Sequence, residues 1–270
     1  MTAELELRDV VVSFNGFRAT DGVSMSIEQG ELRFLIGPNG AGKTTLIDVI
    51  TGLTPVTEGD VLFRGESLVG VPSHKIVQKG IGRSFQTPTV FQALTVLDNL
   101  DLAASFKMST LKLFRKRRGI SAAVADTMEQ IGLTDSAHRV AGALSHGQKQ
   151  WLEIGMLLVQ QPRMILLDEP VAGMSPQERA ATGELLQRLA GDHTIVVIEH
   201  DMAFLRSYAE KVTVLHEGKI LLEGTVDQVQ GNPLVQEVYL GRARDARSGH
   251  VAPTDSGEAA QAPDAQEVLS

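Results

Sequence analysis

The sequence predicts an α/β fold with parallel strands at its core and an antiparallel β piece at the N-terminus. Three short, mainly apolar runs, at residues 32–37, 163–170 and 194–201, are each continuous and contain several Leu, Ile or Val residues. Such runs are typical of strands that are covered on both faces of a parallel sheet. Two further strand-like segments, at residues 5–14 and 22–27, precede them and predict the antiparallel piece.

The first apolar run leads into a glycine-rich segment, GPNGAGKTT, that matches the pattern G-x-x-x-x-G-K-[ST]. The run TTLIDVITGL continues this segment as a predicted helix. Glycines allow backbone N–H groups to curl around a phosphate, and the helix N-terminus adds partial positive charge. Lys43 is expected to reach the β- and γ-phosphates, and the Thr44 hydroxyl to ligate Mg²⁺. We therefore predict an ATP or GTP site formed by Gly37, Pro38, Asn39, Gly40, Ala41, Gly42, Lys43, Thr44 and Thr45.

Polar residues stand at the ends of the other two runs: Asp168 and Glu169 in one, His200 in the other. Ligands of an open α/β sheet bind beyond the carboxyl ends of its parallel strands, so these side chains should meet Lys43 at one edge. Asp168 is the expected Mg²⁺ carboxylate, directly or through water. Glu169 is the expected general base for a water beyond the γ-phosphate, and His200 should contact that phosphate or the water. The alternatives are carboxylates that cap helices and a structural histidine.

Two more residues are candidates for the same site. Gln86 follows a plausible strand, and its amide could complete Mg²⁺ coordination or orient the water. An adenine ring needs a flat apolar partner, and of Phe14 and Phe17 we choose Phe14 for that stack. Both rings could instead belong to the core.

Composition narrows the class of protein. The 270 residues include no cysteine, which excludes a disulfide framework and a thiolate metal site. No apolar run approaches the ~20 residues that span a bilayer, so we expect a soluble, cytosolic protein. The net charge of −8 disfavours general nucleic-acid binding.

Charge is distributed unevenly along the chain. Residues 248–270 contain four acidic residues and no Lys or Arg, and we predict a disordered tail after a folded unit that ends near Gly241. An opposite bias occurs between residues 106 and 120, which form either a solvated surface segment or a patch that faces lipid headgroups or a membrane partner. Its basic residues are Lys107, Lys112, Arg115, Lys116, Arg117 and Arg118.

A second candidate anion site lies about a hundred residues after the glycine-rich segment. The stretch ALSHGQKQWLEIGMLL, residues 143–158, begins with small polar residues and continues with apolar residues at helical spacing. Ser145 is a plausible helix cap, and a helix start can hold an anion. The sequence therefore predicts two anion sites in one chain.

The order of these segments resembles the ATPase subunit of ABC transporters, over residues from about Leu5 to Arg242. The resemblance implies a P-loop NTPase fold of ABC type, with a mixed core sheet, an N-terminal antiparallel β piece and an inserted helical subdomain at about residues 87–160. Residues 1–242 would form the ATPase domain and residues 243–270 the acidic tail. It also implies that two subunits close head to tail on ATP and Mg²⁺. The γ-phosphate held by one subunit would then contact Ser145, Gly147 and Gln148 of the other, and His146 would either add a contact to the nucleotide or face solvent.

Two positions depart from the family pattern. The signature is usually Leu-Ser-Gly-Gly-Gln, whereas His146 occupies the first glycine position here. After the Walker-B Glu and Pro the family usually has Ser-Ala-Leu-Asp, whereas residues 171–174 read VAGM, without the aspartate. The first departure should leave function intact, and the second puts coupling through that carboxylate in doubt.

The segments LSHGQKQWLEIGMLL, DEPVAGMS, IGRSFQTPTVF, VTVLHEGKILLEG and NPLVQEVYLGR together look like the urea-type importers. These are relatives of the branched-chain amino acid importers, which are the alternative. The resemblance implies a second ATPase subunit, two membrane permeases and an extracytoplasmic solute-binding protein, with this chain on the cytoplasmic face of the membrane. A soluble ABC ATPase acting on nucleic acid and a P-loop kinase are remote alternatives, because the chain has one set of motifs, no sustained heptads and the LSHGQ segment.

Overall fold

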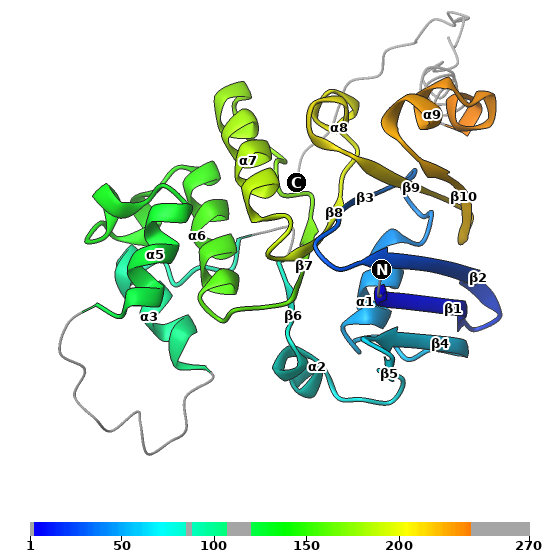
Figure 1. Ribbon diagram of the computed structural model, residues 1–270, viewed down its shortest axis with the longest axis horizontal. Helices are drawn as coiled ribbons and strands as arrows, with labels where there is room; N and C mark the ends of the chain where they lie inside the picture. The colour runs from blue at the N-terminus through cyan, green and yellow to red at the C-terminus, as the bar shows by residue number, and fades with distance from the viewer. Residues whose placement is uncertain (1–2, 85–87, 107–119, 239–270) are drawn as a thin grey trace, which may run out of the picture.

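The computed structural model describes residues 3–84, 88–106 and 120–238 of the chain, and the structural statements below concern these residues. Two β-sheets lie on one side of the molecule and a group of helices lies on the other (Figure 1). The predicted α/β architecture, with an antiparallel piece before a mixed core sheet, is confirmed. Among the helices of these segments, none combines the length and apolar character that crossing a membrane requires.

The N-terminal sheet is antiparallel and has the strand order β2-β1-β4-β5. Strands β1 (Ala3–Phe14) and β2 (Phe17–Glu28) form a hairpin, so the strands predicted at 5–14 and 22–27 are confirmed and extend further. Asn15 and Gly16 form its turn with φ angles of 50° and 89°, which suits the twist of a two-residue hairpin. Strand β4 (Glu58–Phe63) pairs with β1, and β5 (Glu66–Ser67) pairs with β4.

The core sheet has the order β10-β9-β3-β8-β7-β6. The three predicted apolar runs form its adjacent strands β3 (Leu32–Ile36), β8 (Thr194–Ile198) and β7 (Met164–Asp168), which are parallel and buried throughout. Strands β6 (Ile81–Arg83) and β9 (Lys211–His216) continue the parallel part on either side. Strand β10 (Lys219–Gly224) runs antiparallel to β9 at the edge and makes the sheet mixed.

Helices cover both faces of the core sheet. Helix α1 (Lys43–Ile50) packs between the two sheets, where its Ile47 shares one apolar cluster with Leu5 of β1 and Leu166 of β7. Helices α7 (Pro176–Leu189) and α8 (Met202–Tyr208) lie on the other face, followed in the chain by β9, β10 and α9 (Val226–Gly231). The Phe204 ring of α8 contacts Phe34 of β3 at a centroid distance of 6.0 Å.

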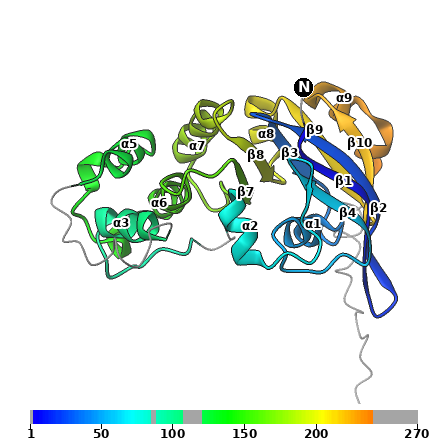
Figure 2. The same ribbon diagram turned by 60° about the horizontal axis from the view of Figure 1, so that its bottom comes forward.

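Three of the other helices form a lobe beside the core sheet. It contains α3 (Val96–Ser105), α5 (Ala122–Gln130) and α6 (His146–Leu158), with 3₁₀ turns at Thr134–Ser136 and Ala141–Ala143. In Figures 1 and 2, β6 and helix α2 (Ser73–Lys79) lie between this lobe and α1. The division of the chain at residues 87, 160 and 242 remains a prediction. The basic segment at 107–118 and the acidic tail lie outside the described residues.

Candidate nucleotide site

The segment between β3 and α1 forms a tight loop hemmed in by backbone atoms. Gly37 has a φ angle of 154° and Gly42, the residue before α1, has 102°. A Cβ atom at Gly37 would lie 2.2 Å from the carbonyl oxygen of Leu215, and one at Gly42 would lie 2.5 Å from that of Ala19. Main-chain carbonyls cannot rotate away as side chains do, so only glycine fits these two positions.

Helix α1 begins at Lys43, and the first amides of a helix have no carbonyl partner within it. Lys43 Nζ lies over the loop and donates to the carbonyl oxygens of Gly37 at 2.7 Å and Pro38 at 3.1 Å. Thr44 is exposed and Thr45 is half-buried. The loop thus gathers amide donors, an ammonium group and a hydroxyl at one place, as phosphate binding requires.

Asp168, the last residue of β7, is buried with 4% exposure. Burial raises the pKa of Asp168, and the neighbouring charges of Arg83 and Lys43 act in the opposite direction. Its Oδ2 lies 3.9 Å from Arg83 Nη2. Lys43 lowers and Glu169 raises the pKa of Asp168, so the phosphate-loop lysine and both strand-end carboxylates lie within electrostatic reach of one another.

Glu169 follows β7 in the left-handed region, with a φ angle of 50°. Its N–H donates to the carbonyl oxygen of Ile198 on β8 at 3.0 Å, which fixes this unusual backbone conformation. Its Oε1 lies 3.6 Å from Nδ1 of His200, whose side chain is exposed. The two candidate groups for handling a proton therefore face each other beyond the ends of β7 and β8.

A third carboxylate, Glu199, links the segments that follow β7 and β8. No role for this residue was predicted from the sequence. It is 1% exposed and accepts N–H bonds from Val171 at 3.3 Å and His200 at 3.1 Å. Burial raises the pKa of Glu199, and these backbone donors oppose the rise. The sequence did contain a signal for this residue, because Glu199 directly follows the mainly apolar strand β8 and precedes the candidate histidine.

The remaining candidates of this half of the site are Gln86 and Phe14. Gln86 lies outside the described residues, so its role remains a prediction. Phe14 is 49% exposed at the end of β1, opposite Phe17. Two residues further along β2, Ala19 contacts the position of Gly42, so the hairpin borders the phosphate loop. Stacking of Phe14 on adenine remains a prediction.

The LSHGQ segment starts a helix, as predicted. Ser145 caps α6: its Oγ accepts the Gln148 N–H at 3.1 Å, and the Gln148 side chain accepts the Ser145 N–H at 3.1 Å. His146 is exposed, and a Cβ atom at Gly173 would lie 3.7 Å from its ring. The ring therefore lies beside the segment 171–174, at which the chain also departs from the family pattern. Helix α6 lies on the far side of β6 and α2 from α1 (Figures 1 and 2), so the two anion sites are separate within one chain.

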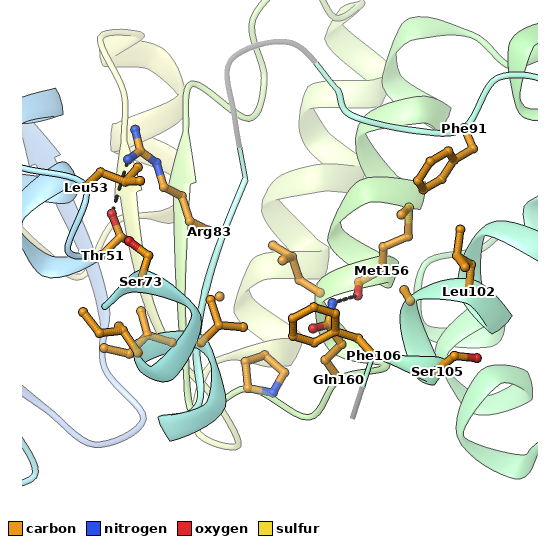
Figure 3. Close-up of a pocket in the computed structure, with 17 residues that line it drawn as sticks. Thr51, Leu53, Ser73, Arg83, Phe91, Leu102, Ser105, Phe106, Met156 and Gln160 are labelled. Atoms are coloured by element: carbon orange, nitrogen blue, oxygen red, sulfur yellow. Dashed lines mark hydrogen bonds between the residues drawn. The ribbon is translucent and has the colours of Figure 1, made fainter. Parts of the chain in front are cut away.

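An apolar groove separates the helical lobe from the sheet body (Figure 3). The cavity has a volume of about 620 Å³ and is lined from α2, β6, α3 and α6. Its large exposed apolar side chains are Leu53, Phe91, Leu102 and Phe106. Arg83 on its wall bonds to Asp48, donates to Thr51 Oγ1 at 3.5 Å and faces Asp168. One side chain thus connects the groove with the candidate metal carboxylate.

The donor set fits Mg²⁺. Thr44 and Asp168 offer the hard oxygen ligands that Mg²⁺ prefers, and a buried carboxylate gains from a nearby cation. Within residues 3–84, 88–106 and 120–238, no group of three or more His, Cys, Asp or Glu side chains could hold a metal by itself.

Taken together, this loop, these strand ends and the capped start of α6 are the arrangement of an ATP-binding cassette. The family model described as ABC transporter matches residues 20–172, and a second, described as branched-chain amino acid ATP-binding cassette transporter, matches residues 219–245. The chain belongs to the ATP-binding subunits of ABC transporters, whose ATPase activity powers transport.

Similar proteins support this family assignment over 88% of the chain. The high-affinity branched-chain amino acid transport ATP-binding protein BraF of Pseudomonas aeruginosa is 36% identical, over 88% of this chain and 98% of its own. LivG of Escherichia coli K12, which carries the same description, is 37% identical with the same coverage. A solved nucleotide-free ATP-binding cassette of an ABC transporter superposes with a TM-score of 0.78 at 33% identity, over 88% of this chain and 99% of that one.

These matches do not support the narrower prediction of a urea importer and agree better with the alternative. The segments that we read as urea-type include VTVLHEGKILLEG and NPLVQEVYLGR, and they overlap the matched region 219–245. These segments are therefore shared with branched-chain amino acid ATP-binding cassettes and do not single out urea.

Proposed function

We propose that this chain hydrolyses ATP to power the import of branched-chain amino acids. The observation that carries the proposal is the similarity to BraF and LivG over nearly their whole length, joined to the phosphate loop with Lys43 and the buried carboxylate Asp168. We place the chain on the cytoplasmic face of the membrane, attached through permease subunits.

The phosphate loop holds the nucleotide. The amides at the start of α1 and the Lys43 ammonium bind the β- and γ-phosphates, and Lys43 exchanges its two loop carbonyls for phosphate oxygens. Phe14 stacks on the adenine ring. Thr44 and Asp168, with Gln86, would hold Mg²⁺, which when bound supplies positive charge at the phosphates.

Hydrolysis depends on Glu169 and His200. Glu169 accepts the proton of the attacking water as general base, and its fixed left-handed backbone aims the carboxylate beyond the end of β7. His200, 3.6 Å away, contacts the γ-phosphate or the water. Glu199 is a positioning residue, because its carboxylate accepts a hydrogen bond from the His200 backbone N–H. Most of the rate enhancement then comes from positioning and charge stabilisation.

Two subunits complete each site head to tail. The start of α6, with Ser145, Gly147 and Gln148, binds the γ-phosphate of the nucleotide held by the other subunit. His146 is exposed at this surface and can add a contact to that nucleotide. The partner is a second ABC ATPase, identical or homologous, and an extracytoplasmic binding protein delivers the solute to the permeases.

The apolar groove is the docking place for a permease segment. An apolar surface of this size between two lobes is typical of a protein-binding site. The segment would lie against Phe91, Leu102 and Phe106, and its movement would reach Asp168 through Arg83. No nucleic acid partner is needed.

The test is uptake of labelled leucine, at low concentration, in cells that lack this gene. Uptake should disappear and return with the intact gene, and a copy with Lys43→Ala should not restore it. Labelled urea serves as the comparison solute. If leucine uptake stays unchanged in the deletion strain, the branched-chain proposal is wrong, whereas the ATPase assignment stands.

A further inference from the structure

One carboxylate, that of Glu178 on α7, joins the start of α7 to the start of α6. The hydroxyl of Ser145 donates to Glu178 Oε1 at 2.8 Å. The backbone N–H and the hydroxyl of Ser175 donate to Glu178 Oε2 at 3.0 and 2.9 Å. Glu178 therefore completes the cap of its own helix with one oxygen and holds the signature serine with the other.

This carboxylate lies tightly against the signature segment. A Cβ atom at Gly147 would lie 2.6 Å from Glu178 Oε1, so glycine at this position leaves the room that the carboxylate occupies. The backbone N–H of Ser175, the hydroxyls of Ser145 and Ser175 and the charge of His146 lower the pKa of Glu178. An anion thus already lies at the start of α6, the helix end that the proposed function assigns to a γ-phosphate.

The two anions compete for the same hydrogen. A serine hydroxyl has one proton to donate, and Ser145 donates it to Glu178. To donate to a γ-phosphate, the hydroxyl has to leave the carboxylate, and the phosphate brings further negative charge close to it. Like charges at contact distance repel, and at this partly exposed position solvent weakens the repulsion without removing it.

We propose that the Glu178 carboxylate holds the Ser145 hydroxyl until a γ-phosphate replaces it. This displacement of Glu178 sets the ATP concentration at which two subunits close. In the open subunit it keeps Ser145 satisfied and the start of α6 in place. The inference rests on the proposed head-to-tail pairing. Glu178 is a positioning residue, because it acts through Ser145.

A purely structural role of Glu178 predicts a different result for a variant that loses only the charge. Glu178→Gln keeps the size of the side chain and its capping bond to Ser175, since glutamine also serves in a capping box, but removes the charge. A resident anion predicts easier closure in this variant. A structural clasp predicts unchanged or weaker closure.

The experiment measures ATP-driven self-association by sedimentation velocity in a Glu169→Gln background, where ATP is not consumed. Glu178→Gln should lower the ATP concentration for half-maximal association by about tenfold. Glu184→Gln is the matched control: the same charge is removed from an exposed position of α7, and it should leave association unchanged. Glu178→Ala loses charge and cap together and should shift association in the same direction, with a lower melting temperature.

ATP binding by each variant is measured in parallel with a fluorescent nucleotide. Association of Glu178→Gln where the parent does not associate also supports the inference. An unchanged or higher ATP requirement in both Glu178 variants overturns it, as does a lack of association in all variants that bind ATP. If the parent does not bind ATP, the proposed function fails before this inference is reached.

Discussion

The two anion-binding regions of this chain are built in different ways. The phosphate loop is fixed by main-chain neighbours, since Leu215 and Ala19 place carbonyl oxygens where Gly37 and Gly42 leave no side chain. The start of α6 is held by side chains, through the Ser145–Gln148 cap and the Glu178 carboxylate. A backbone cradle is rigid, whereas side-chain hydrogen bonds can be exchanged. The first region is suited to hold a nucleotide, and the second to engage and release one held elsewhere.

The largest predicted effect concerns the first region, where one substitution should stop ATP hydrolysis and leave ATP binding intact. Glu169→Gln should lower ATP turnover at least ~10²-fold, because the general base is lost, while ATP binding is retained. Turnover by the assembled transporter and nucleotide binding by the isolated chain measure the two quantities. Turnover close to that of the parent would remove Glu169 from the role of base.

Ser145→Ala, in the second region, should also lower turnover without loss of ATP binding, but by a smaller factor. The isolated chain should bind ATP as before, because α6 is remote from α1, while turnover of the paired subunits falls about 10- to 100-fold through loss of a hydrogen bond to a charged group. Ser121→Ala is the control, since it removes a comparable cap from α5. Equal losses of turnover in both variants would indicate a stability effect only.

A pair of glycine substitutions tests the rigidity of the cradle. Gly40 and Gly42 both have positive φ angles, but a Cβ atom at Gly40 meets nothing within 4 Å. Gly42→Ala should therefore weaken ATP binding at least about tenfold more than Gly40→Ala, since it adds a steric clash to a similar backbone strain. Equal affinities, measured by nucleotide titration, would show that the loop adapts.

The smallest effect is a pH dependence that arises beneath His200. Burial raises the pKa of Glu199 in the folded state, so the folded protein is more stable when this carboxyl group is protonated. This contribution is present at low pH and is lost as the pH rises through the folded pKa. The unfolding free energy of the parent should therefore fall relative to that of Glu199→Gln as the pH rises from about 4.5 toward neutrality. Parallel denaturant-unfolding profiles for the two proteins would contradict it.

The elements predicted well from the sequence are those encoded in short segments. The phosphate loop, the strand-end residues Asp168, Glu169 and His200, and the cap at Ser145 each follow from residues that are neighbours in the chain. Glu178 could not be predicted, because its contact with Ser145 joins positions 33 residues apart. Arg83 joins the groove to Asp48 and Asp168 across three separate elements. The comparisons favour branched-chain amino acids over urea, and the quoted segments did not separate the two because they are shared ATPase segments.

The two regions should form one nucleotide site only between two subunits. The chain has no cysteine, so Asn39→Cys and His146→Cys can be introduced together as its only thiols, one exposed in each region. With Glu169→Gln in the background, mild oxidation in ATP should give a disulfide-linked dimer that does not form without nucleotide. The same yield with and without ATP, or a disulfide within a single chain, would contradict the head-to-tail account.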